Sequence, residues 1–218
     1  RYAEPLTHDR LFGWHNVLFP TGISGLYRID VGKYRRGEMQ VVSGAMGMEK
    51  VHYKAPSPDR VPAEMERLIS WVNECDDVDA VLKAGIAHLW LVSIHPFDDG
   101  NGRITRALTD MLLARSEGSR KRFYSVSAVM KLLQKEYYEV LERTQHGCGD
   151  VTEWLLWFLR CLDKALDSTE DTLSGVMRKA EFWERHRAVS FNERQRKLLN
   201  MQFDGFFGKL TSSKWAKI

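Results

Sequence analysis

The alternation of apolar and polar residues along the chain predicts a mainly helical protein. Residues 80–94 are apolar almost all round, so we expect a buried helix there. Residues 102–116 place their apolar side chains on one helical face and end near Gly118, which predicts a second helix. An earlier helix begins near Pro62 and carries an apolar stripe, formed by Met65, Leu68, Ile69 and Val72.

The remaining pattern adds further helices and one small β-hairpin. Helical periodicity recurs in three later segments, at about 127–145, 152–167 and 170–187. Residues 27–31 alternate briefly, and residues 38–55 alternate on either side of a glycine-rich turn. Residues 1–25 carry prolines and glycines at short intervals, which predicts a loop-rich lead-in. The fold class we expect is therefore mainly α, a helical bundle with a β-hairpin.

Composition limits the class of protein without identifying its chemistry. The 218 residues can bury one sizeable core with room for a small appendage. The net charge of +3, with no block of Lys and Arg, gives no support for nucleic acid as a partner. The three cysteines lack metal-ligand spacing, and we expect reduced thiols in a cytoplasmic protein. Because no apolar run reaches transmembrane length and no signal peptide is visible, we expect no membrane partner.

One stretch, residues 95–106, concentrates the candidate chemistry. It follows one predicted helix and leads into the next, so it forms a loop that closes onto a helix N-terminus, a favourable place for phosphate. Gly100 and Gly102 bracket Asn101 and allow the backbone N–H groups to form a nest for an anion. The stretch also holds a base, a carboxylate suited to Mg²⁺ and two guanidinium groups; these are His95, Asp99, Arg103 and Arg106.

Taken alone, such a loop could be only a helix–helix connection with good capping residues. That interpretation does not explain why a base, an acid, two glycines and two arginines occur together. The residues match, position for position, the signature H-x-F-x-[D/E]-G-N-G-R-x-x-R. On these residues the chain resembles the Fic family.

The resemblance extends beyond the signature, over about residues 26–185. Residues 38–62 look like the family's hairpin "flap" and the start of the helix after it. Residues 136–150 resemble the helix that walls the family's adenine pocket. The resemblance therefore implies a Fic-type helical bundle with a flap, in which Tyr138 and Gln145 contact the nucleotide. Relatives often have Asn where this chain has Gln145, and both side chains carry an amide that donates and accepts.

The activity implied by the resemblance is Mg²⁺-dependent transfer of AMP from ATP to a Ser, Thr or Tyr hydroxyl of a target protein. His95 is then expected to take the proton of the incoming hydroxyl, and Asp99 to hold Mg²⁺ against the phosphates. A loop cradle and two arginines would bind the phosphates; these residues are Gly100, Asn101, Gly102, Arg103 and Arg106. The flap is expected to hold an extended segment of the target protein by strand addition.

Three alternatives stay open at this level. The same site could remove AMP from a modified protein by hydrolysis, or it could transfer another group, such as UMP or phosphocholine. From another class of protein, the chain could be a non-enzymatic Fic-based regulator linked to a DNA-binding tail. Such a scaffold has no need of the base His95.

Several nearby side chains also have purely structural interpretations. We expect His88 to be a hydrogen-bonded core histidine and Tyr137 to be a core aromatic residue on an apolar stripe. His52 is expected to belong to the polar face of a flap strand. Tyr138, in contrast, is expected to contact the ligand.

The resemblance also implies an organisation and a control. We expect a lead-in at 1–25, a catalytic core at 26–187 and, at 191–218, the start of an incomplete winged-helix-like module that does not bind DNA by itself. Many Fic proteins carry an inhibitory helix, [S/T]-x-x-x-E-[G/N], whose Glu pairs with the second arginine of the signature, here Arg106. The sequence lacks this motif and begins at Arg1, so we expect the helix upstream or on another chain. A homodimer is also among the expected assemblies.

Overall fold

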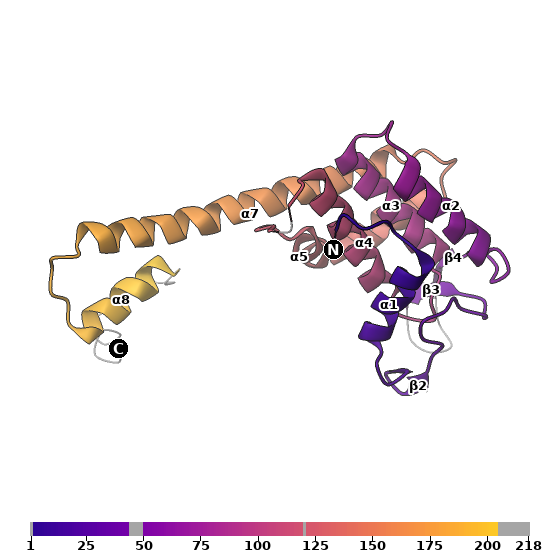
Figure 1. Ribbon diagram of the computed structural model, residues 1–218, viewed down its shortest axis with the longest axis horizontal. Coiled ribbons are helices and arrows are strands. Elements are labelled where there is room, and N and C mark those ends of the chain that lie inside the picture. The colour runs from indigo at the N-terminus through magenta and orange to yellow at the C-terminus, as the bar shows by residue number, and fades with distance from the viewer. Residues whose placement is uncertain (1, 44–49, 120, 205–218) are drawn as a thin grey trace. The chain divides into compact units, whose positions relative to one another are not determined.

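The structure is a computed structural model that describes residues 2–43, 50–119 and 121–204 (Figure 1). The chain forms two compact units, Arg1–Leu162 and Asp163–Ile218, and the signature of residues 95–106 belongs to the first. The described residues are mainly helical, as predicted. No helix among them is both long and apolar enough to cross a membrane. The predicted limits of the catalytic core at 26 and 187 stay a prediction.

Three helices form the centre of the first unit, and all three were predicted. They are α2 (Val61–Glu74), α3 (Ala80–Ile94) and α4 (Asn101–Ser116). α3 packs against both α2 and α4, which explains why it is apolar on nearly all sides (Figure 1). The Asp79 side chain caps α3 by accepting hydrogen bonds from the Val81 and Leu82 N–H groups.

The segment before these helices corrects the predicted loop-rich lead-in, because it contains the helix α1 (His8–Leu18). Thr7 caps it, with its hydroxyl accepting from the Arg10 N–H at 3.1 Å. Gly13 lies in mid-helix, where glycine costs about 1 kcal/mol relative to alanine. Burial of Leu11 and His15 beside α4 outweighs that cost. The glycine was therefore misleading as a loop signal.

In the described part of the chain, two antiparallel hairpins follow α1. The first is very short and pairs β1 (Ile23–Ser24) with β2 (Tyr27–Arg28), so only part of the alternation at 27–31 forms a strand. The second pairs β3 (Gln40–Ser43) with β4 (Lys50–Lys54), which confirms the predicted flap hairpin. The glycine-rich turn predicted between these strands lies largely outside the described residues.

The later helices differ in two places from the prediction. The helix predicted at 127–145 is two helices, α5 (Val126–Leu132) and α6 (Gln134–Gln145), separated by a non-helical Leu133. No glycine or proline marks this break, so the sequence carried no signal for it. The two helices predicted at 152–187 are instead one continuous helix, α7 (Thr152–Arg185). In its middle, the hydroxyls of Thr169 and Thr172 bond to the carbonyls four residues back, so these polar side chains are accommodated within the helix.

The second unit contains the C-terminal part of α7 and the helix α8 (Glu193–Phe203). α8 lies within the segment at 191–218 that was predicted to start a winged-helix-like module, and it opens with a capping box between Asn192 and Gln195. Phe182 packs against both Phe191 and Phe203. The rest of that predicted module, from residue 205 on, lies outside the described residues.

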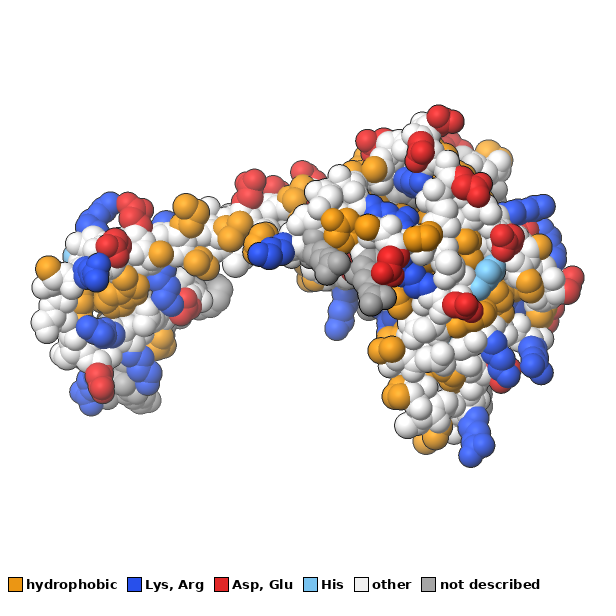
Figure 2. Space-filling view, viewed as in Figure 1, with side chains coloured by type: hydrophobic (Ala, Val, Ile, Leu, Met, Phe, Trp, Pro, Cys, Tyr) orange, Lys and Arg blue, Asp and Glu red, His pale blue; other side chains and the backbone are white. Residues whose placement is uncertain are grey.

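On the face of the first unit seen in Figure 2, basic, acidic and apolar side chains are interspersed.

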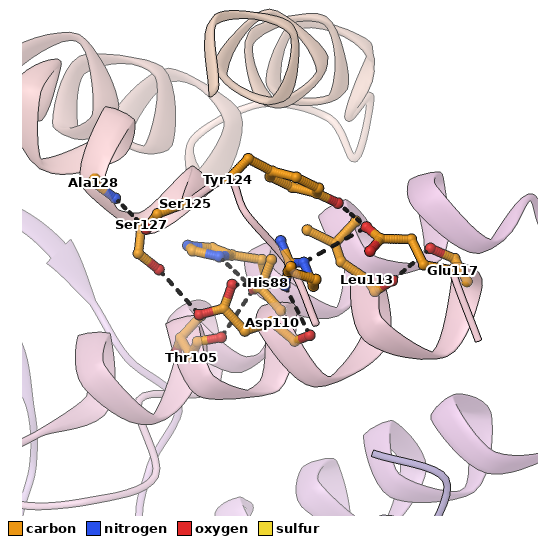
Figure 3. Close-up of polar contacts among 12 residues, drawn as sticks. His88, Thr105, Asp110, Leu113, Glu117, Tyr124, Ser125, Ser127 and Ala128 are labelled. Atoms are coloured by element: carbon orange, nitrogen blue, oxygen red, sulfur yellow. Dashed lines mark hydrogen bonds and ion pairs between the residues drawn. The ribbon is translucent and has the colours of Figure 1, made fainter. Parts of the chain in front are cut away.

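The C-terminal half of α4 is held in place by the segment that follows the helix. Arg122 contacts two carboxylates, Asp110 in the C-terminal half of the helix at 3.0 Å and Glu117 at its C-cap at 3.6 Å. Ser127 also bonds to Asp110 (Figure 3). The helix that carries both arginines of the signature is therefore anchored at its far end.

Candidate active site

The signature lies where α3 ends and α4 begins, and it borders a cavity of about 820 Å³. The other walls of the cavity come from the flap strands β3 and β4 and from α6. This volume is in the range of sites that enclose small molecules. All the predicted site residues line it: His95, Asp99, Gly100, Asn101, Gly102, Arg103, Arg106, Tyr138 and Gln145.

His95 occupies an unusual backbone conformation at the end of α3. Its φ and ψ are 51° and 58°, the left-handed region, and no other non-glycine residue in the described part of the chain has a positive φ. A non-glycine residue there is strained and persists only when its surroundings hold it. This conformation ends α3 and turns the backbone into the loop, and the His95 ring lines the cavity.

One hydrogen bond sets the tautomer of the His95 ring. Nδ1 lies 3.0 Å from the carbonyl oxygen of Val92. Because a carbonyl only accepts, Nδ1 carries the proton and Nε2 keeps its lone pair. Burial lowers the pKa of His95 from 6.5; the Val92 bond and Asp99 oppose this shift, while Arg35 adds to it. The ring is therefore neutral near pH 7, with Nε2 able to accept a proton.

Asp99 is held as a carboxylate at the rim of the same loop. Ser24 donates its hydroxyl to Oδ2, the Gly100 N–H donates to Oδ1 at 2.5 Å, and Arg103 lies 3.6 Å from Oδ2. Partial burial raises the pKa of Asp99, but the bonds from Ser24 and Gly100 and the charge of Arg103 outweigh it and lower the pKa overall. The side chain is ionised at neutral pH and remains half exposed.

These residues fit a Mg²⁺ ion that arrives with a nucleotide. In the part of the chain that the structure describes, no group of three or more acidic, His or Cys side chains forms a metal cage. Mg²⁺ commonly takes only one or two protein carboxylates and completes its shell with phosphate oxygens and water. Asp99 supplies one such carboxylate at the cavity, and Asp98 lines it as well.

Asn101 shapes the loop through its amide. Oδ1 accepts from the Phe97 N–H at 2.9 Å and Nδ2 donates to the Phe97 carbonyl at 2.7 Å, and the residue as a whole is only 3% exposed. Phe97 is fully buried and stacks on His15 with 4.3 Å between ring centroids. Phe97 thus anchors the loop in the core. The direct phosphate contact predicted for the Asn101 amide stays a prediction.

The N-terminus of α4 faces the loop as an anion site. Gly100 caps it with φ 81°, and a Cβ there would lie 2.8 Å from the Phe19 ring, so only glycine fits without displacement. Among the described residues, no acceptor pairs with the backbone N–H groups of Asn101 and Gly102. Unpaired N–H groups at a helix N-terminus bind anions well.

The two arginines lie on the same side of α4. The Arg103 guanidinium sits over the Phe19 ring, 4.6 Å from its centroid. Arg106 lines the cavity, and no carboxylate within the described ranges forms an ion pair with it. A Cβ on Gly102 would lie 3.4 Å from the Arg106 guanidinium, so this glycine leaves room beside the group.

Behind the cavity, His88 and Tyr137 form a buried polar chain. Thr109 donates to the Thr105 carbonyl and therefore accepts from His88 Nδ1 at 2.9 Å. His88 Nε2 then accepts the Tyr137 hydroxyl at 3.0 Å. Burial, with a smaller effect of Arg106, lowers the pKa of His88 to about 3. Both interpretations as core residues are confirmed by burial, and Figure 3 shows His88 reaching toward α4 near Thr105.

The other two α6 residues have different surroundings. Tyr138 is half exposed beside Tyr137, while Gln145 donates from Nε2 to the Ser93 hydroxyl at 2.9 Å. Both line the cavity, and their nucleotide contacts stay a prediction.

Sequence reasoning missed a link that joins the flap to α6. Glu142 accepts from His52 Nδ1 at 2.8 Å and lies 3.2 Å from the Lys50 ammonium group. The hydrogen bonds from these two residues lower the pKa of Glu142. His52 also contacts the Ser43 hydroxyl, so it connects both flap strands to the helix rather than only facing solvent. Alternation along the strand predicted a polar position but not its partner.

Three more polar side chains that the sequence did not single out contact the signature loop: His15, Ser24 and Arg35. His15 accepts the Gly32 N–H at Nδ1, so its Nε2–H donates to the Asp99 carbonyl at 3.0 Å. Each of the three comes from the N-terminal segment, far from the loop in sequence. No local motif marked them, and only the fold brings them to the loop.

Comparison with known proteins agrees with this geometry. The Fic/DOC family pattern matches residues 5–113, half of the chain. Relatives named "Protein adenylyltransferase Fic" from Drosophila mojavensis and Drosophila grimshawi are each 30% identical over 141 residues, or 64% of this chain. The chain spans only about a quarter of the length of these curated relatives, 25% and 26%.

Solved structures share the fold. A Fic family protein from Desulfovibrio desulfuricans G20 matches with a TM-score of 0.63 at 24% identity, covering 97% of this chain and 56% of that one. A Fic domain containing signaling protein from Bacteroides thetaiotaomicron matches with a TM-score of 0.56 at 24% identity, covering 78% of this chain and 65% of that one. Signature, cavity and fold thus agree with the family match, and the chain belongs to the Fic/DOC family.

Proposed function

We propose that this chain is a protein adenylyltransferase that transfers AMP from ATP to a Ser, Thr or Tyr hydroxyl of a target protein. The observation that carries the proposal is the position of His95, a neutral histidine whose Nε2 has no hydrogen-bond partner among the described residues. It borders the same cavity as a helix N-terminus with unpaired N–H groups and two arginines. The names of the Drosophila relatives support the same activity.

In the proposed reaction, the target hydroxyl oxygen attacks the α-phosphorus of ATP while His95 Nε2 takes the hydroxyl proton. The bond from the α-phosphorus to the bridging α–β oxygen breaks, and pyrophosphate leaves. The backbone N–H groups of Asn101 and Gly102 stabilise charge on the α-phosphate. Arg103 and Arg106 bind the outer phosphates as charge-assisted donors. Asp99 would hold Mg²⁺, which offsets charge on the leaving group when it is bound.

The flap is the proposed docking place for the target. β3 lines the cavity and pairs on one side with β4, while its other edge has no strand partner in the described ranges. An extended segment can add to such an edge through backbone hydrogen bonds, which requires little of its sequence. This arrangement brings a hydroxyl of the added segment toward the cavity that His95 borders.

Control and location are also proposals. Arg106 lacks a carboxylate partner among the described residues, so it is available to the glutamate of an inhibitory helix supplied upstream or by another chain, including the partner in a homodimer. A cytoplasmic location is supported by the thiols of Cys75 and Cys148, which are not joined in a disulfide.

Incubation of the chain with lysate proteins and ATP labelled at either the α- or the γ-phosphorus tests the proposal. Transfer of AMP retains the α-label on protein and loses the γ-label with pyrophosphate. Retention of the γ-label alone would indicate phosphorylation and contradict the proposal. Loss of AMP from a previously modified protein, or labelling only from UTP or a choline nucleotide, would instead support the reverse reaction or another transferred group. No labelling under any condition would favour a non-enzymatic regulator.

A further inference from the structure

Arg35 is a buried cation with an unusual set of partners. It is 2% exposed, and its guanidinium lies among backbone carbonyl oxygens rather than carboxylates. Nε donates to His95 O at 2.8 Å, and one terminal nitrogen donates to Gly37 O at 2.7 Å. The other donates to Pro56 O at 2.5 Å and approaches Ile94 O at 3.4 Å. Within the described part of the chain, no carboxylate forms an ion pair with it.

These carbonyls belong to two different parts of the first unit. Gly37 precedes β3 and Pro56 follows β4, so they flank the two ends of the flap. Ile94 and His95 stand at the C-terminal end of α3, where the last carbonyls of a helix lack partners and attract a cation. A planar guanidinium can bond in several directions at once, whereas an ammonium group cannot reproduce that fork. Arg35 therefore joins both ends of the flap to the backbone at His95.

The same region holds the strained residue of the loop. His95 has a positive φ, and its own carbonyl accepts from Arg35 Nε. The backbone N–H of Arg35 donates to the next carbonyl, Pro96 O, at 2.9 Å. A residue of the flap itself, Tyr53 of β4, donates its hydroxyl to Ser93 O at 3.0 Å. The peptide planes on each side of His95 are thus held by Arg35, and the plane before them is held by Tyr53 of the flap.

We propose that Arg35 is a positioning residue: it holds His95 in the left-handed conformation and couples the flap, where the target binds, to the orientation of the base. The inference rests on the proposed function in that it takes His95 to be the base. It goes further by assigning a role to a residue outside the signature. Arg35 does not line the cavity, so it acts through His95 and the flap rather than by touching substrate.

The proposal predicts a specific kinetic pattern. ATP binds to the α4 N-terminus and its arginines, none of which bonds to Arg35, so the affinity for Mg²⁺-ATP should stay within about twofold in Arg35→Lys. The rate of AMP transfer at saturating ATP should fall about 10- to 100-fold, because a misplaced catalytic group costs that much in rate. Tyr53→Phe, which removes the second link, should lower the rate in the same direction by a smaller factor.

A matched control is available in Arg115, which also donates its guanidinium to backbone carbonyls, at Tyr2 and Glu4. It lies at the other end of α4 and does not line the cavity. Arg115→Lys loses a comparable bracing group but should leave the transfer rate and the His95 signals unchanged. If Arg115→Lys lost as much transfer rate as Arg35→Lys, the effect of Arg35 would be explained by a general loss of stability. That result would overturn the proposal.

A readout independent of activity separates this proposal from the proposed function. ¹⁵N NMR of the ring nitrogens reports the His95 tautomer, and Arg35→Lys should mix the Nδ1–H form with the Nε2–H form. An unchanged His95 spectrum in folded Arg35→Lys would overturn the proposal whether or not AMP transfer occurs. If Arg35 variants do not fold, the rate at which the Arg35 Nε–H of the wild-type chain exchanges with solvent, measured by NMR, tests the proposal instead. Slow exchange with solvent supports its bond to His95 O, and fast exchange contradicts it. Absence of AMP transfer by the wild-type chain, with the NMR result as expected, would refute only the activity.

Discussion

His15 Nε2 lies 3.0 Å from the carbonyl oxygen of Asp99, although 84 residues separate them in the sequence. This bond, together with the stacking of His15 on Phe97, fixes the middle of the signature loop from α1. The histidine is buried, and burial lowers its pKa, so it serves as a neutral donor rather than as a cation. The position of the Asp99 carboxylate thus depends on a helix outside the signature.

His15→Phe should therefore weaken both the fold and the loop. It keeps an aromatic ring against Phe97 but leaves the Asp99 carbonyl and the Gly32 N–H without partners. Each buried polar group left unpaired costs about 1–3 kcal/mol, so the loss of two bonds should lower the free energy of unfolding by about 2–6 kcal/mol. Urea denaturation measures this. Substitution of an exposed histidine, His146→Phe, serves as the control. An equal loss of unfolding free energy in both variants would contradict a stabilising role for the His15 hydrogen bonds.

Much of the fold could be predicted from the sequence where the signal is local. The apolar pattern of residues 80–94 and 102–116 identified α3 and α4, and the signature residues between them meet at one cavity. α1 was missed because Gly13 suggested a loop, although burial of Leu11 and His15 decides the outcome. The break between α5 and α6 at Leu133 has no glycine or proline to mark it, and the continuity of α7 through residues 168 and 169 has no local signal either.

There is a physical reason why the residues that hold the signature loop from outside could not be predicted from the sequence. His15, Ser24 and Arg35 reach the loop over sequence separations of 84, 75 and 60 residues. Their partners are mostly backbone carbonyls, which any residue supplies, so no residue type at the far end marks the contact. Only the packing of the N-terminal segment against the loop brings them together.

The buried His88 should make stability depend on pH. Its folded pKa is about 3, far below the ordinary 6.5, so between these values the unfolded chain binds a proton that the folded chain does not. Stability from this residue is therefore present above pH 6.5 and declines as pH falls, by about 2 kcal/mol at pH 5. Urea denaturation at pH 7.5 and pH 5 should show a smaller difference in His88→Gln than in wild type. An identical difference would show that His88 does not titrate on unfolding.

The rate of AMP transfer should also depend on pH through His95. Because burial lowers its folded pKa below 6.5, the ring stays neutral and able to accept a proton at pH 7 and above. The rate should be level from pH 7 to pH 8 and should fall about tenfold per unit below the lowered pKa. kcat/KM measured between pH 5 and pH 8 tests this. A rate that rises as pH falls below 6.5 would mean that the protonated ring is the active form.

Asp99 and Arg106 should act on ATP before the chemical step. Asp99→Ala removes the proposed Mg²⁺ ligand, and Arg106→Ala removes a guanidinium that lines the cavity without a carboxylate partner among the described residues. We expect each to weaken Mg²⁺-ATP binding at least about tenfold, as loss of a charge-assisted contact typically does. Isothermal titration measures the affinity, with Arg185→Ala, an exposed arginine of α7, as the control. If both site variants bound Mg²⁺-ATP with unchanged affinity, the prediction that Asp99 and Arg106 contact the polyphosphate would be wrong.

The central claim is that His95 is the base of an AMP transfer, and His95→Asn tests it most directly. Asparagine tolerates the left-handed backbone conformation that residue 95 adopts, so the loop should keep its shape. The measurement is the initial rate at which α-labelled ATP modifies protein, with Mg²⁺-ATP affinity determined on the same samples. We predict at least about a 10²-fold loss of rate, typical of a removed general base, with affinity within about twofold of wild type. A His95→Asn variant that binds ATP normally and still labels protein at the wild-type rate would contradict the claim.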